Sequence, residues 1–477
     1  MKNKFLIFLF LVCSSIGVFG EKIGNIKEEF FITEYTEESS TENLKIEQEL
    51  MVQTVDPVKL ADSYSRRVTG LIYDTLFVIN SNGEIVPNLV ERYNWQEENK
   101  LFIKLKSGIR FHDGSELTSK DIENSLMRLK KEGTVVEMYN SILGVEIIDK
   151  YSLIINLNIR DGLLLNALSN SFSSIAKVEN GKFYGTGPYS IEVFNEGVLK
   201  LKNFDKCFDR NENMYKEIEI RWDLNPNQRI IKYTNDINNF VFDLYKEDIE
   251  KAEDYDLLSD ETVVEKSLIY DTLGLMFGKK YTIDERVAIE RAVYQNVDGF
   301  FPEDLVEPEL SKIDKDYNLN EAKKLISEVG LKSKKIDIMV LNTEHNMKIA
   351  NYVKKNLEDA GMKVTLLPHG MTSFYQKLYA RDYDTAIYNI NISTIYPILS
   401  LEKILIYDIG DKETANALLP FIELMRKEKN PEKVKKLFDK VLSLVNKNML
   451  YIPIEHKETF QIAEEENMKR FHEIVGY

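Results

Sequence analysis

LIYDTLFVINSNGEIVPNLVERYNWQEENKLFIKLKSGIRFHDGSELTSKDIENSLMRL, residues 71–129, is the stretch that decides the fold. Its opening, residues 71–79, is an apolar run rich in β-formers that predicts a strand, and the Asn-Gly pair at 82–83 predicts a tight reversal after it. Residues 101–106 place Leu101, Ile103 and Leu105 on one face and the lysines on the other, which predicts a strand with one buried face. A short strand is expected at residues 109–111, between two glycine turns.

A helix follows these strands. Thr118 is the expected N-cap, and Asp121 three residues later completes a capping box. Apolar residues recur at helical spacing between Ile122 and Leu129, and Gly133 stands where the helix should end. The stretch therefore predicts three strands that lead into one capped helix.

Several spaced motifs in this stretch closely resemble the signature of the peptide/nickel-type extracellular solute-binding proteins of ABC importers. The matching elements, in chain order, are Leu76-Phe77, residues 82–89, Trp95, residues 106–114, and residues 117–122 with Ser125 and Arg128.

His112 lies inside one of these motifs and is one of 5 histidines in the chain. No second histidine or cysteine stands at ligand spacing from it, so we predict no metal site. We interpret His112 as a turn histidine that bonds locally to the Asp-Gly pair after it.

Composition bounds the architecture. At 477 residues the chain should divide into two or three domains. Its 43% hydrophobic and 29% charged residues are ordinary for a globular protein. The formal net charge of −16 disfavours nucleic acid and anionic lipid as partners.

Residues 1–20 have the pattern of a cleaved export signal. Lys2 and Lys4 precede an apolar segment, and Val18-Phe19-Gly20 resembles a cleavage site. Lipid attachment at Cys13 is the alternative, but Val12 stands where lipoprotein signals place a small residue. We expect a periplasmic protein, with Cys207 as the only cysteine after cleavage.

Residues 21–43 are rich in Glu, Ser and Thr and predict a flexible acidic tether, which a strand pattern follows at 44–52. Gly185-Thr186-Gly187-Pro188-Tyr189 predicts a rigid turn with close backbone approach, and it is a second signature of the same family. A helix is expected at 318–326 with Asn320 as N-cap.

The resemblance extends from about residue 44 to about residue 460. It implies an α/β fold of the type II (cluster C) periplasmic binding proteins, with two lobes around a hinged ligand cleft and an extra domain. The implied division is domain I at 44–70, 185–272 and 447–477, domain II at 71–184, and domain III at 273–446.

Residues 383–388 resemble the strand that precedes the ligand site of this family. Peptide-binding members follow it with a tryptophan, an aspartate that pairs with the peptide's amino group, and Asp-Pro. Here Ile390, Ser393 and Tyr396 take those three places, and only the proline is kept. Truncating a buried carboxylate that faces an ammonium costs roughly 3–5 kcal/mol, so free-amine peptides should not be held in the usual way.

The candidate ligand-binding residues come from three segments. A loop that the resemblance turns toward the cleft gives two, a segment expected to precede a helix gives one, and the run after residue 387 gives five. In chain order they are Asp62, Tyr64, Lys348, Tyr388, Asn389, Asn391, Ser393 and Thr394. The amide and hydroxyl side chains can bond a neutral polar ligand. The alternative is that they cap a strand end and face water, and that Lys348 is a solvated helix-start lysine.

We find no catalytic motif, no cofactor motif and no cysteine pair in the mature chain. The resemblance implies a monomeric, non-enzymatic binding component of an ABC importer, which passes a small peptide or other polar ligand to a membrane permease. One alternative is a divergent periplasmic sensor or chaperone-like protein that no longer serves transport. A hydrolase on the same scaffold is a further alternative.

Overall fold

The computed structural model describes residues 42–80, 84–208, 213–278, 281–293, 297, 318–393, 397–405, 412–428, 430–448 and 451–475. The predicted signal peptide and almost all of the predicted tether lie outside these residues. Among the described residues, no helix is long and apolar enough to cross a membrane.

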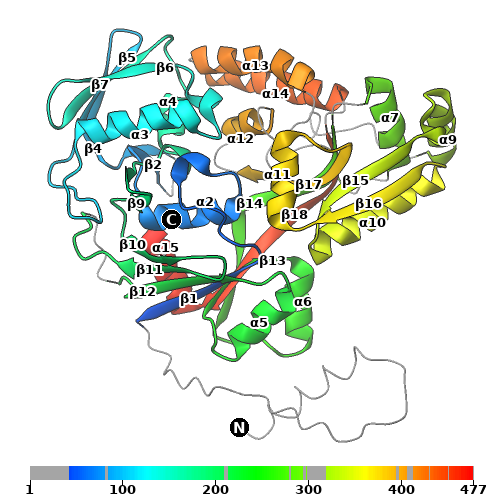
Figure 1. Cartoon of the computed structure of the whole chain (residues 1–477), viewed down its shortest axis with the longest axis horizontal. Coiled ribbons are helices and arrows are strands. Elements are labelled where there is room, and N and C mark those ends of the chain that lie inside the picture. The colour runs from blue at the N-terminus through cyan, green and yellow to red at the C-terminus, as the bar shows by residue number, and fades with distance from the viewer. Residues whose placement is uncertain are drawn as a thin grey trace, which may run out of the picture. The chain divides into compact units, whose positions relative to one another are not determined.

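A mixed sheet of ten strands organises the molecule (Figure 1). From one edge to the other its strands are β10 (Tyr189–Phe194), β11 (Leu199–Asn203), β12 (Glu217–Trp222), β1 (Asn43–Gln48), β13 (Phe240–Leu244), β18 (Tyr451–Glu464), β14 (Thr262–Phe277), β17 (Thr385–Ser393), β15 (Lys335–Leu341) and β16 (Lys363–His369). β1 runs parallel to both of its neighbours, and β15 runs parallel to β16 and β17.

A separate sheet of four strands contains the stretch that opened the sequence analysis. Its order is β4 (Val90–Gln96), β5 (Lys100–Leu105), β7 (Ser152–Leu157) and β6 (Ile142–Ile147). Two small hairpins accompany it, β2 (Phe77–Ile79) with β3 (Ile85–Pro87) and β8 (Lys177–Glu179) with β9 (Lys182–Tyr184).

The helices cover the sheets. They are α2 (Ser63–Ile72), α3 (Ser119–Glu132), α4 (Leu164–Leu168), α5 (Pro226–Thr234), α6 (Lys246–Asp254), α7 (Ile283–Ala292), α9 (Leu319–Glu328), α10 (Glu344–Asp359), α11 (Met371–Ala380), α12 (Pro397–Lys403), α13 (Lys412–Lys427), α14 (Pro431–Lys447) and α15 (Glu465–Val475). Short 3-10 turns lie at Pro57–Lys59, Val136–Tyr139, Ser171–Ser173 and Leu331–Ser333.

The strand predicted at residues 71–79 is wrong in its first part. Leu71 and Ile72 form the last turn of α2, and only Phe77–Ile79 is a strand. This part of the segment is helical because Val68, Leu71 and Ile72 form one buried face of α2. The reversal that follows is confirmed by the antiparallel pairing of β2 with β3, although the turn at 81–83 lies outside the described residues.

The alternating strand and the capped helix are confirmed. Leu101, Ile103 and Leu105, which form the predicted buried face, are fully buried in β5. α3 begins after the N-cap Thr118, whose capping box includes Asp121, and ends at Gly133. The strand expected at residues 109–111 is wrong, because only Arg110 forms an isolated bridge there. The N-cap expected at Asn320 is also wrong, since Asn318 caps α9.

The predicted close backbone approach at Gly185 and Gly187 is confirmed. A Cβ atom on Gly185 would lie 1.8 Å from the carbonyl oxygen of Ile72, and one on Gly187 would lie 2.7 Å from the carbonyl carbon. The interpretation of His112 as a locally bonded turn residue is wrong. Its Nδ1 accepts from the amide of Gly185 at 3.2 Å and its Nε2 donates to the carbonyl of Gly187 at 3.0 Å, so it ties the two signatures together.

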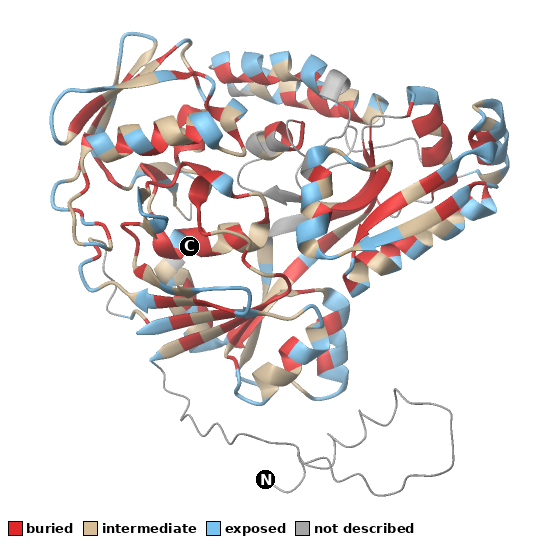
Figure 2. Ribbon diagram, viewed as in Figure 1, coloured by how far each residue is buried: buried red, intermediate tan, exposed pale blue. Residues whose placement is uncertain are grey.

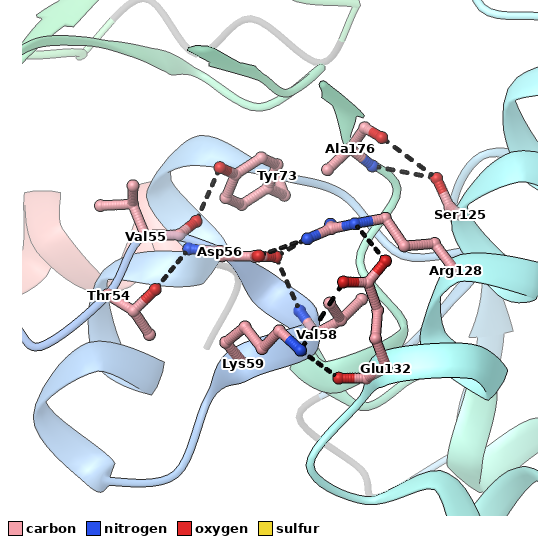
Figure 3. A network of polar contacts seen from close by, with 10 residues as sticks. All are labelled: Thr54, Val55, Asp56, Val58, Lys59, Tyr73, Ser125, Arg128, Glu132 and Ala176. Carbon is pink, nitrogen blue, oxygen red and sulfur yellow. Dashed lines mark hydrogen bonds and ion pairs between the residues drawn. The ribbon is translucent and has the colours of Figure 1, made fainter. Parts of the chain in front are cut away.

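Two other signature residues also have a structural role (Figure 3). Arg128 of α3 pairs with Asp56, and its Nη1 donates to Asp56 Oδ1 at 2.9 Å. The hydroxyl of Ser125 accepts from the amide of Ala176 at 3.2 Å. Nearby, Tyr73 donates to the carbonyl of Val55 at 2.7 Å. The motifs that identify the chain therefore hold segments together.

Apolar side chains fill both faces of the sheet around β14 and β17, and buried residues concentrate along these central strands (Figure 2). Tyr388 and Ile390 of β17 belong to the core on one face, beneath α11 and α14. Ile387 belongs to the core on the other face, beneath α10. The face beneath α10 also carries polar side chains, which are described in the next section.

Candidate functional site

Asp62 and Tyr64 lie at the start of α2. Asp62 is its N-cap, and its two carboxylate oxygens accept from the amide and the hydroxyl of Ser65 at 2.7 and 2.9 Å. The hydroxyl of Tyr64 donates to Glu49 Oε2 at 3.0 Å, and its ring packs against the core that contains Leu50. The expected loop is thus a helix start, and a ligand contact from either residue stays a prediction.

The predicted residues on β17 divide between two faces. Tyr388 is buried beside Phe374, and its carbonyl oxygen accepts from the hydroxyl of Tyr451 at 2.7 Å. Asn389 points to the opposite face, beneath α10. Its buried Oδ1 has no hydrogen-bond partner among the described residues.

Two more predicted residues follow along the same strand. Asn391 and Ser393 continue β17 opposite Asp271 and Ile269 of β14, and their side chains are not described. Thr394 lies outside the described residues.

Lys348 is exposed and lies inside α10, not before a helix as the sequence indicated. The N-cap of α10 is Thr343, whose hydroxyl accepts from the amide of Asn346 at 3.2 Å. The hydroxyl cap sets the start of the helix five residues earlier than expected, because it satisfies an amide of the first turn.

Sequence reasoning missed a polar cluster beside these positions, which we call the junction cluster. It joins the start of α6, the first turn of α10 and the middle of β18. Its members are Tyr245, Glu247, His345, Glu455 and Lys457.

Lys457 is the centre of the junction cluster. Its ammonium lies 3.2 Å from Glu247 Oε1, 3.2 Å from His345 Nδ1 and 4.4 Å from the ring centroid of Tyr245. The rings of Tyr245 and His345 are in contact, with centroids 4.7 Å apart. The side chain of Lys457 is only 8% exposed, so its charge depends on these partners.

His345 is neutral in this cluster. Burial, and next the positive charge of Lys457, lower the pKa of His345 from 6.5 to about 3. An ammonium only donates, so Nδ1 must accept and Nε2 carries the proton. Nε2 lies 3.6 Å from Glu455 Oε2, a distance that is too long for a hydrogen bond. Because the histidine is uncharged, this contact is not an ion pair at neutral pH.

Two effects act in opposite directions on the pKa of Glu455. Burial raises the pKa of the Glu455 carboxyl, and the charge of Lys457 opposes that shift. The Oε2 atom of Glu455 and the Nε2 atom of His345 are both buried without a hydrogen-bond partner among the described residues. Their hydrogen-bonding capacity is therefore not used within the described residues.

Strand register brings Glu455 and Asn389 to one face of the sheet. Each pairs with Leu273 of β14, Asn389 from β17 and Glu455 from β18. Paired residues of antiparallel strands share a face, and two strand spacings separate these two by roughly 10 Å.

A second charged group lies at the end of β1 and β13. Arg67 pairs with Asp243 at 2.5 Å and donates to Gln48 Oε1 at 2.9 Å. Burial alone would raise the pKa of Asp243, but the positive charge of Arg67 outweighs burial, and the pKa of Asp243 is lowered. Asp243 has a φ of 60°, a left-handed conformation next to the start of α6. The ion pair thus holds the irregular backbone of β13 two residues before Tyr245.

One sequence signal could have found the junction cluster. Glu455, His456 and Lys457 follow directly after the apolar residues 451–454, and a second histidine stands in the segment 343–348. The described residues include no group of three or more His, Cys, Asp or Glu side chains that could hold a metal ion. The cluster can offer hydrogen bonds and charge to a ligand.

Solved structures of similar fold are binding proteins. *Staphylococcus aureus* NikA in complex with Ni(L-His)2 is 18% identical, has a TM-score of 0.76, and aligns over 89% of this chain and 95% of its own. *Helicobacter pylori* DppA in complex with the peptide STSA is 18% identical, has a TM-score of 0.78, and aligns over 88% and 94%. At this identity the likeness shows the fold, which is the predicted type II α/β fold.

Curated relatives match over shorter segments. The nickel-binding protein NikA of *Staphylococcus aureus* is 25% identical over 229 residues, which are 46% of this chain and 45% of that protein. The glutathione-binding protein GsiB of *Escherichia coli* K12 is 28% identical over 165 residues, 32% of each chain. The chain thus aligns with less than half of the length of either relative.

A family model settles the relationship. The model of the bacterial extracellular solute-binding proteins, family 5 Middle, matches residues 84–405, well over half of the chain. The match includes the signature around His112, the Gly-Thr-Gly-Pro-Tyr segment, and β17. The chain belongs to family 5 of the bacterial extracellular solute-binding proteins, as its motifs predicted.

Proposed function

We propose that this chain is the substrate-binding component of an ABC importer. It is exported by residues 1–20, binds a small peptide or another polar ligand as a monomer, and delivers that ligand to a membrane permease without making or breaking a bond. The observation that carries the proposal is the family match over residues 84–405.

The two longest strands support a hinged mechanism. β18 pairs with β13 near Phe460–Ala463, and β14 pairs with β17 from Ile269 to Phe277. Each of these two strands therefore extends from the part of the sheet that contains β13 to the part that contains β17. The β14–β18 register shifts between Lys266 and Tyr270, which makes this segment the natural place for bending. Ligand binding would then favour a closed arrangement of the two sides.

The proposed binding region is the end of β17 together with α10. Asn389, Asn391 and Ser393 stand at alternate positions of β17, and Lys348 adds a positive charge from α10. Asp62 and Tyr64 stay in the proposal as contacts from α2, and Thr394 stays in it as a residue outside the described ones.

Native mass spectrometry tests this function. The mature protein is purified from cells grown in peptide-rich medium and is compared with the same sample after denaturation and refolding. We expect a discrete excess mass that refolding removes, and a decrease in the radius of gyration when the released fraction is added back. Absence of both would overturn the importer assignment, binding of unfolded chains without closure would indicate a chaperone, and turnover of the ligand would indicate a hydrolase.

A further inference from the structure

The junction cluster and Asn389 contain polar atoms that the fold leaves unused. Asn389 Oδ1, His345 Nε2 and Glu455 Oε2 are buried, and none has a hydrogen-bond partner among the described residues. Buried polar groups are nearly always bonded in native proteins, so three on one face need an explanation. A ligand that donates to the two acceptor atoms, Asn389 Oδ1 and Glu455 Oε2, is one.

These atoms lie on one side of the sheet. Glu455 and Asn389 both pair with Leu273, and His345 stands in the first turn of α10 over the same face, 3.6 Å from Glu455. The three residues come from segments more than 40 positions apart in the sequence and lie on one side of the sheet only in the fold.

The three atoms differ in their hydrogen-bonding roles. Lys457 fixes the proton of His345 on Nε2, so that atom is a neutral donor. Glu455 Oε2 and Asn389 Oδ1 are acceptors, and one of them belongs to a group that can carry negative charge. Lys457 makes its close ion pair with Glu247, at 3.2 Å, and not with Glu455. Among the described residues, Glu455 therefore makes no ion pair with a lysine or an arginine.

We propose that Glu455 and Asn389 form a subsite for a positively charged nitrogen of the ligand, an ammonium or a guanidinium group. This inference rests on the proposed function and names its substrate class. The cation donates to Glu455 Oε2 and to Asn389 Oδ1, and charge-assisted hydrogen bonds of this kind are the strong ones. A cation beside Glu455 also favours its ionised form, which burial alone disfavours.

A matched pair of variants on one strand tests the subsite. Glu455→Gln keeps the size of the side chain and removes its charge. Glu458→Gln makes the same change three residues away, where the carboxylate pairs with Lys266 at the surface. Thermal midpoints establish that both variants are folded before binding is measured.

The first measurement is native mass spectrometry of the wild type and both variants, each purified from peptide-rich medium. We expect the wild type and Glu458→Gln to carry a ligand with a basic nitrogen and Glu455→Gln to lose it. A ligand without a basic nitrogen, or equal retention by Glu455→Gln, overturns the subsite and leaves the proposed function in place.

The second measurement does not need the natural ligand. Methylammonium chloride is titrated into protein with ¹³C-labelled glutamate, and the carboxyl signal of Glu455 is assigned from its absence in Glu455→Gln. We expect a saturable shift of that signal, and about tenfold weaker binding in Glu455→Gln by methyl-signal broadening. Asn389→Ala should weaken binding less, and it serves as the test if Glu455→Gln does not fold. No saturable response to methylammonium, with sodium chloride as reference, overturns the proposal.

Discussion

Two buried charged groups in this molecule differ in how completely they are satisfied. In the first, Arg426 of α13 donates to Asp161 at 2.8 Å and to Glu402 at 2.6 and 3.3 Å, and Ser141 donates to Asp161 at 2.6 Å. In the second, the junction cluster, His345 and Glu455 face each other without a hydrogen bond.

The difference teaches what each group is for. Arg426 is 6% exposed and Asp161 is fully buried, and Arg426 joins two segments that are far apart in the sequence. In Figure 1 these are the cyan loop before α4 and the orange helix α13. A satisfied network of this kind fixes an arrangement. The junction cluster keeps hydrogen-bonding capacity that the described residues do not use, and the proposed cation subsite depends on that capacity.

The largest expected effect comes from breaking the satisfied network. Arg426→Met should destabilise the protein by about 3–5 kcal/mol, because it leaves two buried carboxylates without their cation. Urea denaturation followed by far-UV circular dichroism measures the change. The neighbouring Lys427→Met is the control, since the side chain of Lys427 is 48% exposed and should have almost no effect.

A triple variant separates charge from packing. Arg426→Met combined with Asp161→Asn and Glu402→Gln removes all three charges together. Its stability should lie well above that of Arg426→Met alone, because no carboxylate is left uncompensated. Equal stability of the triple and the single variant would contradict this account of the network.

Several local elements of the fold could be predicted from the sequence. The capped helix α3, the strand β5 and the turn at Gly185 follow from local pattern, since caps, alternation and glycine positions act within a few residues. Family membership followed from the same motifs, but the contacts by which His112 and Arg128 hold distant segments together did not.

The candidate site was less predictable for a physical reason. Glu455 and Asn389 share a face only because both pair with Leu273, and His345 comes within 3.6 Å of Glu455 only through the packing of α10. No local pattern encodes such register. The start of α2 shows the same limit, because the expected loop around Asp62 is a helix cap whose oxygens bond Ser65.

Removing the cation of the junction cluster should cost less than removing Arg426. Lys457→Met leaves Glu247 without its partner, but the side chain of Glu247 is 51% exposed and water can solvate it. The loss of the bond to His345 Nδ1 dominates, at about 1–3 kcal/mol. Urea denaturation of Lys457→Met beside Lys457→Arg measures it. A loss as large as that of Arg426→Met would show that the two groups do not differ.

The pH dependence of stability should reveal the neutral state of His345. Its folded pKa of about 3 lies below the ordinary value of 6.5, so the unfolded chain binds a proton first. His345 therefore contributes stability above pH 6.5 that is lost as the pH falls toward 3, by about 1–2 kcal/mol between pH 6.5 and 5. Urea midpoints at several pH values, for the wild type and His345→Gln, measure this. Identical slopes for the two proteins would contradict it.

The smallest expected effect tests whether a charge at the protein surface influences the buried group. Lys348 is exposed on α10, and its charge is among those that lower the pKa of Glu455. Lys348→Ala should change the free energy of unfolding by less than about 0.5 kcal/mol. It should still raise the pKa of Glu455 measurably, in a ¹³C titration of the labelled carboxyl, because less positive charge then favours the ionised form. Lys427→Ala should leave that titration unchanged. If Lys348→Ala leaves it unchanged too, the junction cluster is as insulated from solvent charge as Arg426, and the contrast between the two groups rests on hydrogen bonding alone.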